Sequence, residues 1–163
     1  MKNTDKFLIG IVVGIVALVI AAFVVTLTRP EPTYQPEDTP EGVAHNYLLA
    51  LQKKDYERAY GYLSPVLDGY PASVDEFAEA VTDYSWQFRL DADTTLAVES
   101  ARAVGSRTVV QVRESRFYGG SLIGNSQSVT MFDIKLGFED GAWKIVDADY
   151  YFAGCWRNDE GCR

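Results

Sequence analysis

The sequence has few of the side chains on which most enzyme chemistry depends. It contains one histidine and two cysteines among 163 residues. This is too small a set for the four ligands of a zinc site. Its glycine-rich stretch, with Gly119, Gly120 and Gly124, lacks the lysine and the helix start of a phosphate-binding loop. We therefore expect no metal site, no cofactor, no catalytic set and no enzyme activity.

The remaining acid–base candidates are His45 and three aspartates. His45 falls on the polar side of an expected helix, which favours a surface residue. Asp133 alternates with Ile134 and should face away from the apolar side of its strand. Asp147 and Asp149 share one face, where a carboxylate pair could bind a cation or share a proton. On an exposed strand, we interpret both as solvated charges.

Positive charge is scarce beyond residue 29. Only Asp5 among the 23 acidic residues, and only Lys2, Lys6 and Arg29 among the 15 basic ones, lie in residues 1–29, so the remainder has a net charge of −10. A domain this acidic repels nucleic acid and anionic lipid headgroups. We expect no nucleic-acid partner, and a domain that stands away from the membrane surface.

Charge is absent altogether from residues 7–28, FLIGIVVGIVALVIAAFVVTLT. As a helix this stretch would be about 33 Å long, which matches a hydrocarbon core of about 30 Å. A buried core helix is seldom apolar on every face over this length. We expect a single transmembrane helix over residues 7–28, integral to the membrane.

A cleaved signal peptide is the main alternative. Its apolar region usually runs about 7–15 residues and ends at a small-x-small cleavage site. Here the run is longer and ends in Leu27-Thr28-Arg29-Pro30, so an uncleaved signal-anchor fits better. Lys2 and Lys6 before the span outnumber Arg29 after it, which predicts a short cytoplasmic tail, residues 1–6, and a domain outside.

The only cysteines, Cys155 and Cys162, lie close together near the end of the chain. Such a pair persists as a disulfide in an oxidising compartment. We expect the bond to close a C-terminal tail, residues 153–163. Two free thiols at a frayed end are the alternative.

Two glycines in the apolar segment form a G-x-x-x-G motif, Gly10 and Gly14. Four-residue spacing places both on one helix face, where another backbone can approach closely. Glycine is also common in membrane helices without such a role. We expect this face to contact a second copy of the chain or a helix of a larger membrane complex.

Residues 29–40 hold four of the six prolines and three acids. This composition predicts an extended, semi-stiff linker of up to about 35 Å. The folded domain should then occupy residues 41–152.

Capping residues followed by apolar residues at helical spacing predict three helices in that domain. They begin after Thr39, Asp55 and Ser73. From about residue 85 the period changes to two, and Asp140-Gly141 signals a tight hairpin. The expected strands are 94–104, 108–117, 132–138 and 143–152. Helices followed by strands predict an α+β fold with an antiparallel sheet of about four to five strands.

Two segments of this domain carry a resemblance to a known superfamily. Lys54-Asp55-Tyr56-Glu57-Arg58-Ala59-Tyr60, leading to Leu63-Ser64-Pro65, resembles the opening of nuclear transport factor 2-like domains. Asp140-Gly141-Ala142-Trp143-Lys144-Ile145-Val146 is similar to their terminal hairpin. The resemblance covers residues 40–152. It implies a cone-like fold, in which a bent antiparallel sheet wraps around helices.

The superfamily includes isomerases, dehydratases, ligand-binding modules and accessory domains, so the resemblance implies a fold more than a function. Many bacterial members behind a membrane anchor have no assigned activity, which implies a place in the bacterial cytoplasmic membrane. Ten tyrosines suggest either an aromatic core or an aromatic pocket with Tyr60, Phe132 and Tyr150 in its wall. We expect a non-catalytic, extracytoplasmic interaction module of a membrane or envelope complex. An isomerase, a dehydratase or an apolar-ligand-binding domain is the alternative.

Overall fold

The computed structural model describes residues 2–27, 31–90, 94–118 and 126–162. The end of the expected span at Thr28, the start of the expected linker and the glycine-rich segment 119–125 lie outside these ranges. The chain divides into two compact units, Met1–Pro32 and Thr33–Arg163. The first contains the helix α1, Lys2–Leu27. Its 19-residue stretch Lys6–Val24 is long and apolar enough to be a candidate membrane span or signal anchor.

The second unit begins with helices whose starts agree with the expected capping residues. Thr39, Asp55 and Ser73 each accept a hydrogen bond from a backbone N–H of the first turn, at 3.1 to 3.3 Å. The helices are α2 (Pro40–Lys53), α3 (Tyr56–Gly61) and α4 (Val74–Asp83). Two short elements were not expected: the helix α5 (Ser85–Phe88) and the 3-10 helix η1 (Gly154–Arg157).

Within the described residues, four strands form an antiparallel sheet in the order β1-β2-β3-β4. They are β1 (Thr94–Val104), β2 (Arg107–Tyr118), β3 (Ser126–Glu139) and β4 (Ala142–Ala148). Asp140 and Gly141 have positive φ angles, 49° and 84°, which suit the tight turn between β3 and β4. Compared with expectation, β3 is longer, and β4 ends before Phe152.

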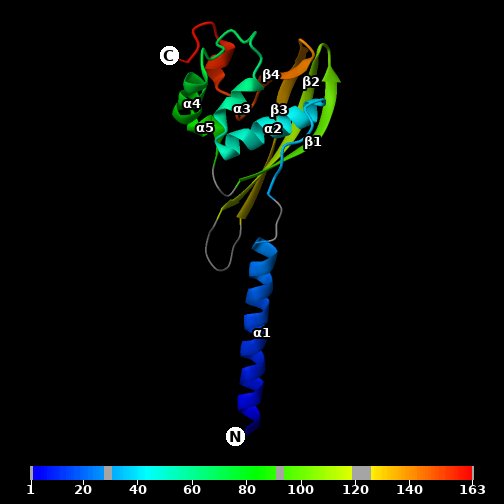
Figure 1. The fold of residues 1–163 in the computed structure, drawn as a ribbon, viewed down its shortest axis with the longest axis vertical. Coiled ribbons are helices and arrows are strands. Elements are labelled where there is room, and N and C mark those ends of the chain that lie inside the picture. The colour runs from blue at the N-terminus through cyan, green and yellow to red at the C-terminus, as the bar shows by residue number, and fades with distance from the viewer. Residues whose placement is uncertain (1, 28–30, 91–93, 119–125, 163) are drawn as a thin grey trace. The chain divides into compact units, whose positions relative to one another are not determined.

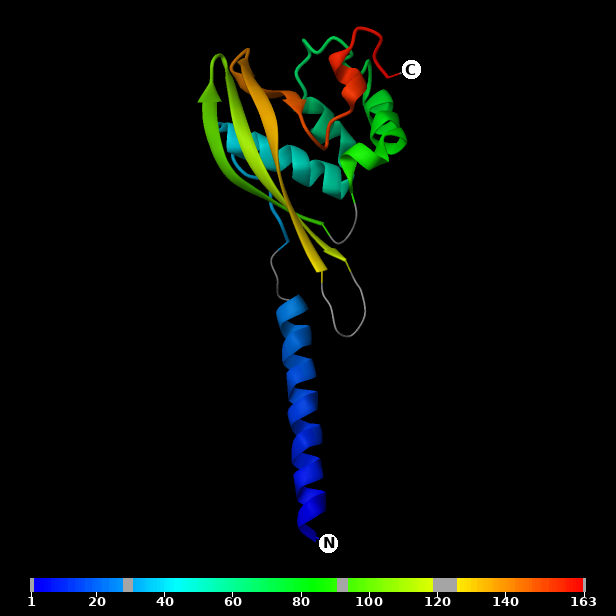
Figure 2. The same cartoon turned by 180° about the vertical axis from the view of Figure 1, so that it is seen from behind.

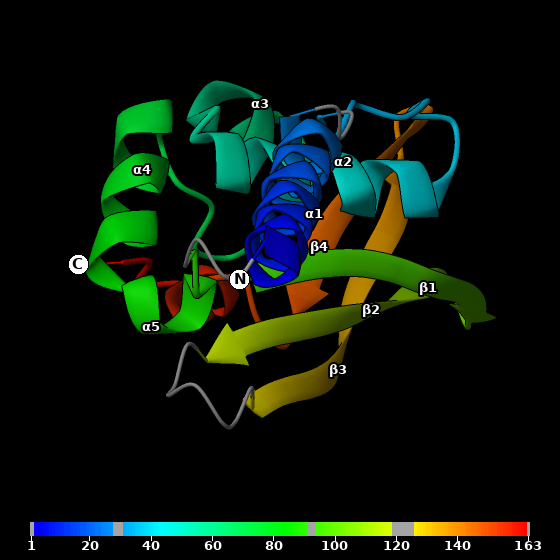
Figure 3. The same ribbon diagram turned by 90° about the horizontal axis from the view of Figure 1, so that it is seen from below.

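The sheet bends, and α2 lies across its concave side (Figures 1 and 2). Figure 3 shows α3, α4 and α5 gathered at one side of the sheet. Inward-facing side chains alternate along the central strands and pack against α2. They include Val110 and Val112 of β2, Ile134 and Leu136 of β3, and Tyr47 and Leu51 of α2, all buried. The expected α+β, cone-like architecture is confirmed.

The structure places the start of the folded unit earlier than residue 40. Gln35 exchanges two hydrogen bonds with the buried Asn46 of α2, at 2.7 and 2.8 Å. Glu37 accepts a 2.6 Å bond from the Tyr62 hydroxyl. A Cβ atom on Gly42 would collide with the carbonyl oxygen of Pro36. The second half of the expected linker therefore packs on α2 as part of the domain.

The C-terminal segment is also part of the core rather than a peripheral tail. Trp156 in η1 is 1% exposed and stacks on Phe77 of α4, with ring centroids 5.2 Å apart. The indole also meets Phe88 and Phe152 edge-on. The folded domain therefore extends past residue 152, because its core is completed from the end of the chain.

Candidate functional site

A buried carboxylate lies inside the bent sheet. Glu114 of β2 is 1% exposed, and both of its oxygens are bonded. Oε2 accepts from Arg89 Nη1 at 3.1 Å, while Oε1 accepts from Arg116 Nε at 2.6 Å and from the Tyr151 hydroxyl at 3.2 Å. A buried charge is costly unless it is paired and hydrogen-bonded. The two guanidinium groups and the phenol meet that requirement.

Two of the three partners of Glu114 sit on strained backbone. Arg89 (φ 47°) ends α5, and Tyr151 (φ 60°) follows β4. Residues other than glycine seldom adopt this left-handed region, and such positions often lie at functional sites. In each case surrounding hydrogen bonds hold the conformation.

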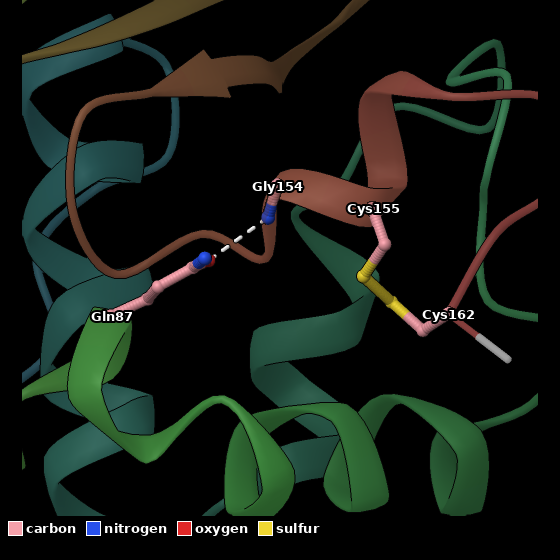
Figure 4. Close-up of a disulfide and its surroundings, with 4 residues drawn as sticks. All are labelled: Gln87, Gly154, Cys155 and Cys162. Atoms are coloured by element: carbon pink, nitrogen blue, oxygen red, sulfur yellow. Dashed lines mark hydrogen bonds between the residues drawn. A yellow bond between two sulfur atoms is a disulfide. The ribbon is translucent and has the colours of Figure 1, made fainter.

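These hydrogen bonds connect α5 to the C-terminal segment. The Tyr151 N–H donates to the Gln87 carbonyl oxygen at 3.0 Å. Gln87 Oε1 accepts from the Gly154 N–H at 2.9 Å, beside the disulfide of Cys155 and Cys162 (Figure 4). Both contacts of Gln87 hold the turn that carries Arg89.

Aromatic contacts position the site further. The Arg89 guanidinium lies 3.7 Å from the ring centroid of Tyr150, a cation–π distance. Tyr150 in turn meets the buried Phe132 edge-on at 5.7 Å. Burial, together with the adjacent charge of Glu114, raises the pKa of Tyr151. Its hydroxyl therefore stays protonated and donates to the carboxylate.

The two arginines form part of the wall of an open cavity of about 640 Å³. Their side chains remain 28% and 21% exposed, whereas Glu114 is closed off behind them. The other described lining residues are three hydroxyl side chains and four apolar ones. They are Ser85, Ser128 and Thr130, and Val81, Trp86, Phe88 and Leu90.

The charged part of the described cavity wall consists of two arginines. Among the described lining residues, the ionisable side chains are Arg89 and Arg116, and arginine keeps its proton in proteins. A general acid or base needs a pKa near the working pH and a path to the substrate. Glu114 instead uses both oxygens to hold the arginines. The cavity therefore presents fixed positive charge beside apolar surface.

Glu114 and its partners were not predicted, although the sequence of β2 carries a signal for Glu114. Val110 and Val112 mark the inward side of β2, and the same period of two places Glu114 and Arg116 on that side. A charged residue that continues an apolar stripe indicates either a strand end or a buried pair. Arg89 lies 25 residues before Glu114, and no pattern in the sequence around it indicates a buried ion pair.

The three aromatics expected around a pocket make packing contacts in the structure. None of them is among the described residues that line the 640 Å³ cavity. Tyr60 packs on Tyr70 and Phe77, with ring centroids 5.1 and 6.0 Å away. Phe132 is buried, and the Tyr150 ring packs against the Arg89 guanidinium. Tyr60 and Phe132 therefore pack in or against the core, and Tyr150 helps to position Arg89.

The acidic candidates on the outside of the sheet are occupied by neighbours. Asp133 faces away from the core, as expected, and pairs with Arg102 at 3.2 Å. Asp149 accepts the Asp133 N–H. Asp147 lies between Lys135 (2.7 Å) and Arg157 (2.6 Å). Burial raises the pKa of Asp147, but the bonds from these two cations outweigh it, and the pKa lies below its ordinary value.

The remaining candidates have simple surroundings. His45 Nε2 lies 3.1 Å from the Thr33 carbonyl oxygen, at the surface. Cys155 and Cys162 form a disulfide, with Cα atoms 5.1 Å apart. Gly10 and Gly14 have open space where a side chain would begin. Within the described residues, no three His, Cys, Asp or Glu side chains are grouped so that they could hold a metal ion.

No protein-family model matches this sequence, and no curated protein matches it. Among solved structures, a SEC-C motif containing protein from Rhodopseudomonas palustris is 14% identical, covers 70% of this chain and 80% of its own, and has a TM-score of 0.47. An NTF-2-like protein of unknown function from Shewanella oneidensis is 12% identical, covering 65% of this chain and 90% of its own, with a TM-score of 0.41. A protein from Nostoc punctiforme with a cystatin-like fold is 11% identical. The match covers 65% of this chain and 82% of the Nostoc chain, with a TM-score of 0.44. Identities this low carry no site, ligand or activity over to this chain.

Proposed function

We propose that this chain is a membrane-anchored, extracytoplasmic binding module, a non-catalytic accessory subunit or binding domain of a membrane or envelope complex. The observation that carries the proposal is the pair Arg89 and Arg116, held by the buried Glu114 in the wall of an open cavity. The two guanidinium groups bring positive charge and N–H donors to the cavity wall, which suits them to hold an anionic ligand.

The anchoring part of the proposal rests on α1. Its apolar stretch Lys6–Val24 has the length and composition of a membrane span. Lys2 and Lys6 favour a cytoplasmic amino terminus. A cone-like domain behind such an anchor is also the organisation of the bacterial nuclear transport factor 2-like proteins without assigned activity, which the sequence resembles.

Protease added outside intact cells, after removal of any outer wall, tests the orientation. The domain should be digested while a cytoplasmic marker survives. Protection until the membrane is permeabilised would place the domain in the cytoplasm. The domain would then not lie in an oxidising compartment, where a disulfide persists.

Site-specific photo-crosslinking in native membranes tests the binding role. A crosslinking residue replaces Trp86, a cavity residue that is 70% exposed, and in a matched control it replaces the exposed Thr95 on the outer side of β1. We expect a discrete adduct from position 86 that position 95 does not give, and that Arg89→Gln weakens. Identical patterns from both positions, or no adduct at position 86, would contradict a binding role for the cavity. If the crosslinked partner is a small molecule and the protein converts that molecule to a product, the isomerase or dehydratase alternative is favoured.

A further inference from the structure

We propose that the free edge of β1 binds a short, extended segment of another polypeptide, with basic and apolar residues, as a further strand of the sheet. Such strand addition takes its affinity from backbone hydrogen bonds and its specificity from alternate side chains. The groove along this edge shares none of its described lining residues with the cavity beside α5. The inference therefore does not depend on the role proposed for that cavity.

The two outer strands of the sheet differ in how their free sides are covered. On β4, the Ile145 N–H donates to the Tyr62 carbonyl oxygen at 2.8 Å, and the Ile145 carbonyl oxygen accepts from the Ser64 N–H at 2.9 Å. Within the described residues, the backbone of β1 forms hydrogen bonds with that of β2 and with no other segment. Backbone groups alternate in direction along a strand, so about half of those in β1 point away from β2 and can pair with another chain.

The edge of β1 also borders a space that a chain can enter. Residues 96–100 of β1 line a cavity of about 460 Å³. The other described lining residues are Gln35, which precedes α2, and Glu41 and His45 in the first turns of α2. Five residues of a strand span about 16 Å. The groove therefore suits an extended segment of about this length.

The side chains of β1 on the concave side of the sheet favour apolar residues in the partner. Leu96 pairs with Glu114 and Val98 with Val112, so both follow the inward-facing positions of β2. Leu96 and Val98 pack against the core but are only partly buried. An added strand places every second side chain on this same side. Apolar side chains there would extend the core over Leu96 and Val98.

The charge of the groove favours basic residues in the partner. Among the described lining residues, Glu41 and Glu99 carry negative charge, and none is a lysine or an arginine. Glu99 pairs with Arg113 of β2, whereas Glu41 lies half-exposed in the first turn of α2. The net charge of −10 beyond residue 29 adds a long-range attraction for a basic segment.

A second copy of this chain fits the edge less well. Two domains that each have a net charge of −10 repel one another. The register of β1 also shifts between Val98 and Ser100, and such a bulge disfavours continuous pairing of two identical edges. The edge therefore suits a short segment of opposite charge.

The test uses the full chain in neutral detergent micelles and measures hydrogen exchange of its backbone amides by ¹⁵N NMR. The probe is the peptide acetyl-Lys-Val-Lys-Val-Lys-Val-amide. One control peptide has proline in place of the second valine, which keeps the charge but removes a backbone N–H and disfavours a strand. A second control has glutamate in place of each lysine. The comparisons use the unmutated protein, so they carry no risk of misfolding.

We expect the basic peptide to slow exchange saturably, by at least about tenfold, at those amides of β1 that do not donate to β2. The Ile145 amide, which already donates to Tyr62, should not change. The proline and glutamate peptides should have little effect. Glu41→Gln should weaken binding about threefold, the effect of losing one exposed ion pair. Glu79→Gln makes the same charge change on the exposed side of α4 and should leave binding unchanged.

Unchanged exchange in β1 with the basic peptide, or equal slowing with the proline peptide, would overturn strand addition. Equal affinity for the acidic peptide would overturn the basic character of the partner. Slower exchange in β1 at higher protein concentration, without any peptide, would show that a second copy occupies the edge instead. The crosslink at position 86 decides the role of the cavity beside α5 separately from all these results.

Discussion

The Tyr47 hydroxyl donates a 2.5 Å hydrogen bond to the backbone carbonyl oxygen of Tyr151, 104 residues further along the chain. Tyr47 lies in α2, and Tyr151 follows β4 in a left-handed conformation. Both side chains are fully buried. This one bond connects the first helix of the domain with the turn that supplies the third partner of Glu114.

Tyr47→Phe should lower the free energy of unfolding by about 1–3 kcal/mol, because it leaves a buried carbonyl group without its partner. Urea denaturation followed by far-UV circular dichroism measures the change. Tyr34→Phe is the matched control, since it removes a 3.2 Å bond to Asp55 at a less buried position. We expect a smaller loss there, and equal losses would contradict a special role for the Tyr47 bond.

Stability should fall at alkaline pH. Burial raises the pKa of Tyr47, and burial with the charge of Glu114 raises that of Tyr151, whereas a tyrosine in the unfolded chain ionises near pH 10. The folded state therefore keeps protons that the unfolded state releases. The contribution is complete below about pH 10 and is lost as the pH rises, by about 1.4 kcal/mol per pH unit for each such tyrosine.

Unfolding free energies measured between pH 9 and pH 11 test this dependence. Tyr47→Phe should remove the part of the slope that one tyrosine contributes. A flat profile across this range would show that the two phenols ionise as readily in the folded protein as in the unfolded chain.

Glu114→Gln should destabilise the domain by about 3 kcal/mol, because it removes a buried carboxylate that pairs with two partly buried guanidinium groups. Glu99→Gln is the matched control, since Glu99 pairs with Arg113 across an exposed face of the sheet. The control should change stability by less than about 0.5 kcal/mol. Similar changes in both variants would mean that the central carboxylate is no more important than a surface charge.

Cys155 and Cys162 should be fully disulfide-bonded in protein isolated from its native compartment. Mass spectrometry of unreduced, alkylated protein decides this, and two alkylated thiols would refute the bond. Replacing both cysteines with serine should cost at most about 2.5 kcal/mol, since the closed loop is short. The effect should include greater exposure of Trp156, which its fluorescence reports.

Under the proposed membrane anchoring, replacing Gly10 and Gly14 with leucine should weaken association of α1 with another helix, because it closes the face on which a second backbone can approach. Membrane insertion of α1 and folding of the unit Thr33–Arg163 should not change. Leucine at Ile11 and Ile15, which have the same spacing on another face, is the control. Equal crosslinking in all three proteins would show that the helix only anchors the domain.

Local signals in the sequence predicted much of the fold. Thr39 and Ser73 cap the expected helices, and Asp140-Gly141 makes the expected hairpin. The range 94–104 coincides with β1. These features depend on residues a few positions apart, so spacing and turn chemistry suffice to find them.

The candidate site could not be predicted in the same way, because it depends on contacts between distant residues. Burial of Glu114 is tolerable only with Arg89, which lies on a short helix, and Tyr151, which lies beyond the last strand. The packing of Gln35 on Asn46 similarly overrides a composition typical of a free linker. Contacts with residues distant in the sequence determine the structure at these positions, and local propensity contains no information on such contacts.

The hydrogen bonds that Gln87 accepts from the C-terminal segment determine when the cavity can form during synthesis. A ribosome makes Arg89 and Arg116 well before Tyr151 and Gly154, which hold them in position. A nascent chain that has emerged only as far as β3 therefore carries both guanidinium groups without a rigid site for them. The described wall of the cavity can take its final form only after the last strand and η1 have been released and have folded back. The site is therefore completed by the last residues to be synthesised.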